Sequence, residues 1–255
     1  MNKIKVQYCS DLHLEFKENL RYIQENPLNP VADILILAGD ILPFALNDKP
    51  NDFIDFVADN YEKVFWIPGN HEYYHFDLKE VSNPLCEKLR SNIYLVNNYA
   101  EFIGDTKIIF STLWSHIQLH NSWQIRKSLS DFLVIKNNGK LISVQDFNQL
   151  HETSFAFIEK SLEENKLGKN VVTTHHVPTL LNYPEQYKNS PLNDGFVVEL
   201  FDFINRSNIS HWIYGHHHSN INDFEIGTTK MLTNQLGYVQ HGEQIAFRRD
   251  AYIEL

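Results

Sequence analysis

Five short apolar segments, each followed directly by a polar motif, limit the fold of this chain more than any other feature. They are residues 4–9, 33–38, 63–67, 171–174 and 211–214. β-Branched and aromatic residues dominate them, and runs of this length and composition predict buried β-strands. In an α/β sheet the carboxyl ends of parallel strands converge on one crevice, where ligands bind. The pattern therefore predicts an α/β fold with a functional site at the strand ends.

The rest of the chain supplies the helices and strands that such a fold needs. Apolar residues recur with helical spacing around 53–57, 147–162 and 196–204. Asp146 lies near the start of the second of these helices, and Asp194 is the expected N-cap of the third. Further strands are expected at 93–96, 107–111, 221–226, 230–233, 238–240 and 245–247. Strands that alternate with helices before a strand-rich end favour a layered α/β architecture.

One long segment, residues 112–145, has few helical signals and reads as irregular. Long irregular segments inside compact domains are often lids or binding loops. We therefore interpret residues 1–255 as one domain that carries an insertion or lid at about 112–145.

The polar motifs carry side chains that bind metal ions. They read SDLH at 10–13, GD at 39–40, GNHE at 69–72, HHVP at 175–178 and GHHH at 215–218. In an extended segment, alternate residues point to the same side, so Asp11 and His13 share a side. Nitrogen and oxygen donors without a thiolate suit manganese, iron or zinc. A single zinc needs only three or four ligands, so this larger set favours two ions that share a carboxylate.

In this order, the five motifs resemble those of the calcineurin-like metallophosphoesterases, and the resemblance runs from Asp11 to His218. It implies a four-layer α-β-β-α sandwich with a di-metal site at the strand ends. It also implies a role for each motif residue: Asp11, His13 and His218 hold the first ion, Asn70, His175 and His216 hold the second, Asp40 bridges them, and His71 is the catalytic histidine. His175 is preferred to His176 because it aligns with the first histidine of the family motif.

The chemistry of such a site accords with hydrolysis of a phosphoester. Two divalent or trivalent cations can hold a bridging hydroxide and position a phosphoryl group for in-line attack. His71 would then either stabilise the charge that develops or protonate the leaving oxygen as a general acid. A zinc hydrolase with one ion and a metal-binding scaffold without turnover are the rival interpretations.

The resemblance leaves the substrate open, although residues near the motifs narrow it. Ile41 follows Asp40, whereas eukaryotic-type Ser/Thr protein phosphatases continue with Val-Asp-Arg-Gly. The SDLHL and HHVP motifs look more like small bacterial phosphodiesterases of the cyclic-nucleotide type. The TLWS stretch at 112–115 and the Asp131-Phe132 pair resemble a bacterial subgroup of predicted phosphohydrolases. We therefore favour a phosphodiesterase acting on a small nucleotide-like substrate, with a phosphomonoesterase or phosphoprotein phosphatase as the alternative.

The insertion offers two candidate substrate-binding residues. Trp123 can stack on a base, and Arg126 can bind a phosphate oxygen. The alternative is a structural lid, with the specificity residues elsewhere, near Tyr73, Tyr74 or Tyr183.

Composition restricts the partners. The net charge of −10 argues against a groove for long nucleic acids, so we expect a small phosphoester substrate. No apolar run reaches the roughly 18 residues that span a membrane, and no secretory signal is visible, which predicts a cytoplasmic protein. The oligomeric state is not predicted.

Overall fold

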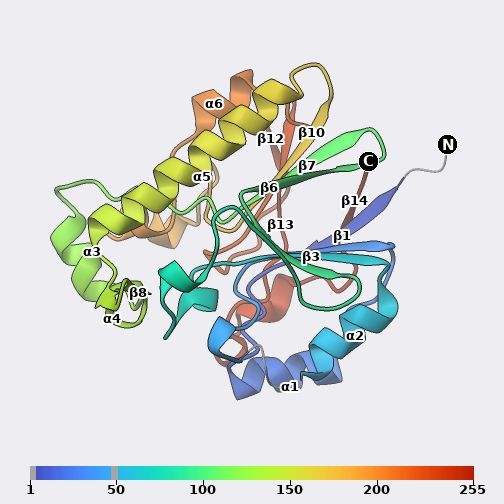
Figure 1. The fold of residues 1–255 in the computed structure, drawn as a ribbon, viewed down its shortest axis with the longest axis horizontal. Coiled ribbons are helices and arrows are strands. Elements are labelled where there is room, and N and C mark those ends of the chain that lie inside the picture. Colours follow the sequence, from blue (N-terminus) through green and yellow to red (C-terminus); the bar gives the residue numbers. More distant parts are fainter. Residues whose placement is uncertain (1–3, 47–50) are drawn as a thin grey trace.

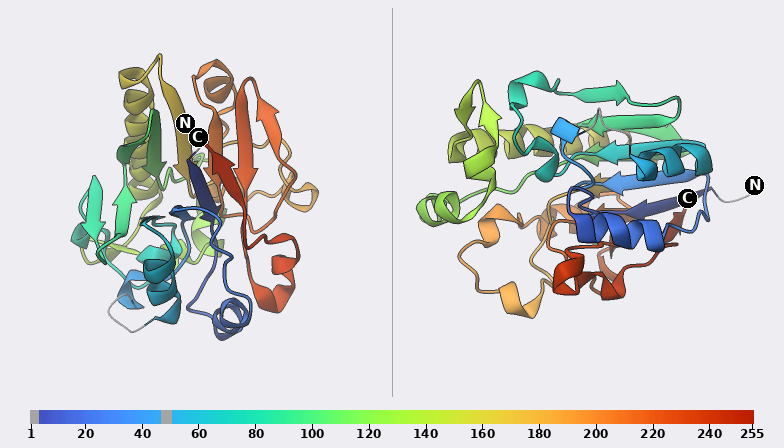
Figure 2. Two further views of the ribbon diagram at one scale, coloured as in Figure 1. Left: turned by 90° about the vertical axis from the view of Figure 1, so that its right-hand side faces the viewer. Right: turned by 90° about the horizontal axis from the view of Figure 1, so that it is seen from below.

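The computed structural model describes residues 4–46 and 51–255. Two six-stranded β-sheets lie face to face, and helices cover the outer face of each sheet (Figures 1 and 2). Three apolar cores separate these layers: one between the sheets, around Phe65 and Phe110, and one between each sheet and its helices. The expected four-layer α-β-β-α sandwich is therefore confirmed.

The first sheet holds the first three of the strands that precede the polar motifs. Its strands, in spatial order, are β14 (Tyr252–Glu254), β1 (Lys5–Cys9), β2 (Ile34–Ala38), β3 (Lys63–Ile67), β5 (Ile93–Asn97) and β4 (Leu85–Lys88). The four inner strands are parallel and the two edge strands are antiparallel. β2 reads ILILA because a strand covered on both faces needs apolar residues at every position.

The second sheet holds the other two strands that precede polar motifs. Its strands, in spatial order, are β12 (Phe224–Ile226), β13 (Thr229–Thr233), β11 (His211–Tyr214), β10 (Lys169–Thr174), β7 (Thr106–Ser111) and β6 (Tyr99–Ile103). β7, β10, β11 and β13 are parallel. The carboxyl ends of β10 and β11 therefore lie at one end of this sheet, as the motif pattern requires.

The helices divide between the two outer faces. α1 (Lys17–Glu25) and α2 (Asp52–Asn60) cover the first sheet, and α5 (Val144–Glu164) and α6 (Phe201–Arg206) cover the second (Figure 1). α5 begins with a capping box in which Ser143 and Asp146 bond reciprocally, so the expected start near Asp146 is confirmed.

Several expected elements differ in the structure. Residues 238–240 and 245–247 were expected to be strands, but this region forms the 3₁₀ helices Val239–His241 and Glu243–Ala246. Gly242, at φ 76°, joins them in the left-handed conformation, which interrupts an extended path. α6 begins only at Phe201, because Val177 pairs with the backbone of Phe196 and Val198. Asp194 is not the N-cap of α6; its carboxylate accepts hydrogen bonds from the 118–121 turn.

The 112–145 segment is more regular than expected. It contains α3 (Ser122–Ser128), α4 (Asp131–Val134) and the two-residue strands β8 (Lys136–Asn137) and β9 (Lys140–Leu141). Ile125, Leu129 and Phe132 are buried and pack with Phe147 of α5. The extended backbone of Leu129 separates α3 from α4, and the two short helices direct Ile125 and Phe132 into the same core.

None of the helices in the described part of the chain is long and apolar enough to cross a membrane.

Candidate metal centre

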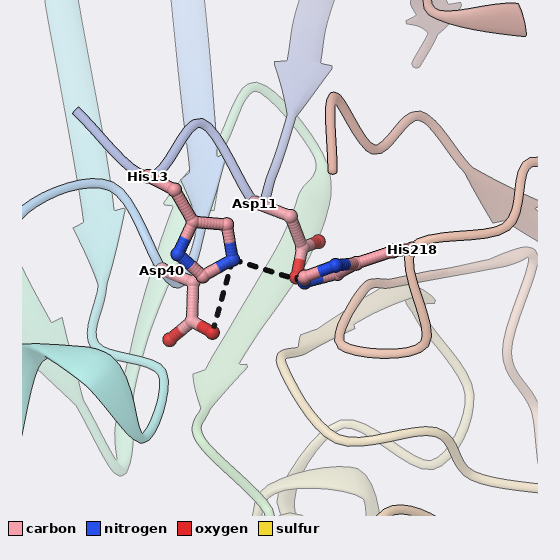
Figure 3. Close-up of side chains that lie close together, drawn as sticks. All are labelled: Asp11, His13, Asp40 and His218. Carbon is pink, nitrogen blue, oxygen red and sulfur yellow. Dashed lines mark hydrogen bonds and ion pairs between the residues drawn. The ribbon is translucent and has the colours of Figure 1, made fainter. Parts of the chain in front are cut away.

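Side chains from three strand ends converge on one point at the carboxyl edge of the sheets (Figure 3). Asp11 and His13 follow β1, Asp40 follows β2 and His218 follows β11. The Nε2 atoms of His13 and His218 lie 2.9 Å apart, and His13 Nε2 lies 3.7 Å from Asp40 Oδ2. His218 Nε2 lies 3.4 Å from Asp11 Oδ1. These four residues form a cluster in which one donor atom of each lies within 4.8 Å of the others.

A second cluster shares Asp40 with the first. It consists of Asp40, His175 after β10 and His216 after β11, and all three are buried. His175 Nε2 lies 3.4 Å from Asp40 Oδ2 and 3.1 Å from His216 Nδ1. Asn70 Oδ1 lies 3.3 Å from the same His175 nitrogen. The structure thus brings together all seven side chains that the motifs singled out as ligands.

The backbone at the strand ends is turned to point these side chains inward. Asp11, His13, Asp40, His216 and His218 all have positive φ angles, between 47° and 77°. Such conformations cost energy for residues with a Cβ, and they persist where the surrounding structure enforces them. Their concentration in the two clusters is typical of a functional site.

The glycines before the ligands also make room for them. A Cβ on Gly69 would collide with the Asp40 carboxylate and the His175 ring, and a Cβ on Gly215 would collide with the Asp11 carboxylate. The space taken up by the ligand side chains is therefore a reason for glycine at these two positions.

In three of these histidines, the outer ring nitrogen, Nδ1, which is not the one nearest the other ligands, lies beside a hydrogen-bond acceptor. His13 Nδ1 lies 3.2 Å from Glu15 Oε1, His218 Nδ1 lies 2.9 Å from Glu243 Oε2, and His175 Nδ1 lies 3.0 Å from the Ala38 carbonyl. A histidine that donates its outer N–H in this way presents a lone pair on the other nitrogen, which is the arrangement of a metal ligand. The lone pairs of His13 and His218 then face each other at 2.9 Å, and a cation would relieve this repulsion. The donor set therefore fits metal ions.

The electrostatic field at the clusters favours positive charge. Burial would raise the pKa of Asp40, but nearby histidines, His175 first, hold it well below its usual range. Burial lowers the pKa of His218, yet hydrogen bonds to Asp11 and Glu243 raise it to about 10. Metal cations can supply this positive charge without protonating the ligands.

Comparisons with known proteins identify the family. A family model described as calcineurin-like phosphoesterase matches residues 4–220. The chain belongs to the calcineurin-like phosphoesterases. Its family and its fold point to a hydrolase that acts on phosphoesters, and the family typically binds divalent metal ions.

One relative and one solved structure match nearly the whole chain. The uncharacterized protein L509 of Acanthamoeba polyphaga mimivirus is 34% identical over 278 residues, which cover 98% of this chain and 96% of the viral protein. The crystal structure of phosphopantetheinyl hydrolase from Mycobacterium tuberculosis superimposes with a TM-score of 0.72 at 16% identity, covering 99% of this chain and 96% of that one. The second comparison supports the fold.

His71 lies beside the clusters. Its Nδ1 lies 2.9 Å from Glu15 Oε1, and its ring stacks on Tyr74 with centroids 4.0 Å apart. Its backbone N–H donates to Asp40 Oδ1 at 2.9 Å. Burial lowers the pKa of His71, but the carboxylates of Asp40 and Glu15 raise it above its ordinary value. The imidazole is thus held in one orientation at the edge of the metal centre.

Glu72 organises the loops beneath the ligands. Its buried carboxylate accepts hydrogen bonds from the backbone N–H groups of Asp40, Ile41 and Gly69 and from the Trp66 indole, all between 2.7 and 2.9 Å. Burial and the charge of Asp40 raise the pKa of Glu72 to about 7. It holds the β2 and β3 loops together rather than contributing to either cluster.

Sequence reasoning missed Asp131, which the insertion brings to the site. Asp131 Oδ1 accepts hydrogen bonds from Asn70 Nδ2 and the Tyr74 hydroxyl, both at 2.9 Å. This orients the Asn70 amide so that its oxygen faces His175. In the sequence, the Asp131-Phe132 pair was noted only because it resembles a bacterial subgroup of predicted phosphohydrolases. Glu15 was also missed, although it continues the alternation of Asp11 and His13.

The structure does not bring Trp123 or Arg126 to the metal centre. α3 directs Ile125 and Leu129 into the core of the insertion, and this turns Trp123 and Arg126 toward solvent. Trp123 is 70% exposed, and Lys127 Nζ lies 4.0 Å from the centre of its ring. Neither residue lines the cavity beside the clusters, so their expected contact with substrate has no support here.

A cavity of about 390 Å³ opens onto the two clusters. Asp40, His71 and the 216–218 histidines line it. Residues 128–131, at the end of α3 and the start of α4, and side chains of the 183–196 segment line it as well. The volume is within the range of ligand pockets and suits a small molecule.

Proposed function

We propose that this protein is a phosphodiesterase with two metal ions and a small, nucleotide-like substrate. The observation that carries the proposal is the position of Asp40, whose Oδ2 belongs to both donor clusters. One carboxylate between two sets of nitrogen donors is the arrangement that two neighbouring cations require.

The residues that would hold the ions are those that the motifs suggested. Asp11, His13 and His218 would hold the first ion, Asn70, His175 and His216 would hold the second, and Asp40 would bridge the two. Manganese, iron and zinc all suit these nitrogen and oxygen donors. When bound, such ions activate water as a nucleophile and offset charge on phosphoryl oxygens.

The chain's own residues would complete the reaction. His71 lines the cavity, and its outer nitrogen is paired with Glu15. We propose that its ring either donates a proton to the leaving oxygen or stabilises charge on the phosphoryl group. Tyr74, which stacks on His71, and Asp131, which holds Tyr74, keep the ring in place.

The preference for a diester rests on the motifs and on the cavity. The strand-end motifs resemble those of small bacterial phosphodiesterases, and the cavity extends beyond the donor clusters, which leaves room for a second ester substituent. A phosphomonoesterase or a phosphoprotein phosphatase is the alternative. A non-enzymatic scaffold is a more distant alternative. A scaffold would not require His71 to be held in one orientation.

Metal-dependent turnover tests the proposal. The protein is stripped with a chelator, reloaded with manganese, iron or zinc, and assayed with bis-p-nitrophenyl phosphate, p-nitrophenyl phosphate and a panel that includes cyclic nucleotides and phosphopantetheinyl esters. We expect turnover only after reloading, faster with the diester, and two ions per chain by elemental analysis. One ion per chain would favour the single-ion alternative. Two ions without any turnover would favour the scaffold.

A further inference from the structure

The 183–196 segment builds an aromatic wall beside the metal centre. Tyr183, Tyr187 and Phe196 line the cavity. The Phe196 ring lies 4.9 Å from the His216 ring at 30°, and the Tyr183 ring lies 5.7 Å from the His217 ring at 62°. These contacts attach the wall to the loop that carries two of the ligands.

Tyr187 is the most exposed of these three aromatic residues. Its side chain is 40% exposed, and no ring contact between it and another aromatic residue is found among the described residues. It ends the 3₁₀ helix Glu185–Tyr187, so its backbone is fixed although its side chain borders open space. An aromatic face held at the mouth of a cavity is a stacking surface for another flat ring.

Neutral polar groups also line the cavity. Ser128 and Ser130 line the cavity from the end of α3, and Ser190 and Asn193 line it from the aromatic side. Hydroxyl and amide groups can bond to a sugar or to an amide without requiring charge. The cavity therefore suits a polar but uncharged group.

The described residues that line the cavity include no Lys or Arg, and the carboxylates among them, Asp40, Asp131 and Glu243, lie in or beside the donor clusters. The ions held by the clusters would offset the charge of one phosphoryl group. A second phosphate further along the cavity would meet neutral side chains and no counter-charge, and the loss of its hydration there would be unfavourable.

We infer that the substrate carries a single phosphoryl group joined to an uncharged, ring-bearing group that stacks on Tyr187, and that substrates with additional phosphates are rejected. This inference rests on the proposed function only for the reaction itself. The selection for a ring-bearing group and against additional phosphates depends on the residues that line the cavity. Binding can therefore test it independently of turnover.

Two substrates that differ by one phosphate test whether an additional phosphate is rejected. Thymidine 5′-(p-nitrophenyl phosphate) and its 3′-phosphorylated derivative release the same nitrophenolate, so the leaving group is constant. We expect the additional phosphate to lower kcat/KM by about tenfold or more, as expected for a charge that has no counter-charge in the cavity. An equal or higher kcat/KM for the 3′-phosphorylated ester would overturn the inference.

Tyr187→Ala tests the stacking surface, and Tyr252→Ala is the matched control. Tyr252 is 42% exposed and lies in β14, which pairs with the opposite end of β1. We expect Tyr187→Ala to raise KM for thymidine 5′-(p-nitrophenyl phosphate) about fivefold or more, the loss expected for one base stack. Both variants should hydrolyse p-nitrophenyl phosphate with similar kcat. A Tyr187→Ala enzyme that matches the control on both substrates would contradict the role of the ring.

Calorimetric binding separates the failure of this inference from the failure of the proposed function. Thymidine 5′-phosphate and thymidine 3′,5′-bisphosphate are titrated into the manganese-loaded protein. Tighter binding of the monophosphate, weakened by Tyr187→Ala, supports the inference even if no ester is hydrolysed. If the monophosphate does not bind, or the bisphosphate binds at least as tightly, the inference is wrong even if turnover is observed.

Discussion

At the scale of single residues, Asp40 has the largest number of roles in the candidate site. Its Oδ2 faces His13 and His175, and its Oδ1 accepts the backbone N–H of His71. One carboxylate thus joins both donor clusters to the proposed catalytic histidine. A change at this position should therefore disturb metal loading and turnover together.

We predict that Asp40→Ala abolishes metal loading and activity together. Without the shared carboxylate, two cations would repel each other across a short gap. Elemental analysis and turnover of bis-p-nitrophenyl phosphate measure the two losses. Asp55→Ala, which changes an exposed carboxylate on α2, is the control and should leave both unchanged. Two ions per chain in Asp40→Ala would remove the bridging role.

We predict that His71→Ala lowers turnover without removing the metal ions. Metal content is expected to stay near two ions per chain, because His71 contributes to neither cluster that contains Asp40. Turnover should fall roughly 10²- to 10⁴-fold if His71 is a general acid. The loss should be smaller for nitrophenolate than for an alkoxide, which needs the proton more. Equal losses for the two leaving groups would instead indicate charge stabilisation.

At the scale of elements, the insertion contributes a polar residue, Asp131, to the metal centre. Ile125, Leu129 and Phe132 anchor it to Phe147 of α5, and this packing places Asp131 against Asn70. The apolar face of α3 and α4 thus determines which polar residue of the insertion reaches the metal centre.

We predict that Asp131→Ala weakens loading at the second cluster and lowers kcat about 10- to 100-fold, the usual effect of losing an outer partner of a ligand. The Asn70 amide would lose the acceptor that orients it. Asp131→Asn should recover part of the loss, because its amide oxygen can still accept one hydrogen bond. Metal titration and kcat measure both effects. Arg126→Ala, at an exposed position in the same insertion, should behave like the unmodified protein.

At the scale of the whole molecule, the metal centre links the two halves of the sandwich. Asp11, His13 and Asp40 come from the first sheet, and His175 and His216 come from the second. Ions bound between them would stabilise the folded state, because the unfolded chain has no such site.

We therefore predict that manganese raises the unfolding midpoint of the stripped protein. At about 100 times the dissociation constant, the gain of about 2.7 kcal/mol corresponds to roughly 5–10 °C. Thermal unfolding followed by circular dichroism, with chelator and with manganese, measures it. Asp40→Ala should show little shift. An equal shift in that variant would mean that the ion binds elsewhere.

The strands and the ligand positions could be predicted because both depend on local patterns. A buried strand needs an apolar run, and a ligand at its carboxyl end follows that run directly, so Asp11, Asp40 and His175 were visible in the sequence. The helical spacing of apolar residues over 147–162, with Asp146 near its start, likewise located α5, and the structure adds the capping box with Ser143. The edge strands β4, β6 and β14 were not expected, since edge strands have fewer apolar residues and depend on a partner strand.

Contacts between distant segments could not be predicted in this way. Trp123 and Arg126 have the chemistry of substrate-binding residues, yet α3 turns them to solvent because Ile125 and Leu129 occupy the core of the insertion. Asp131 and Tyr187 carry no local signal for the candidate site. They line one cavity because the packing of separate segments, rather than residue type or spacing, determines which side chains meet there.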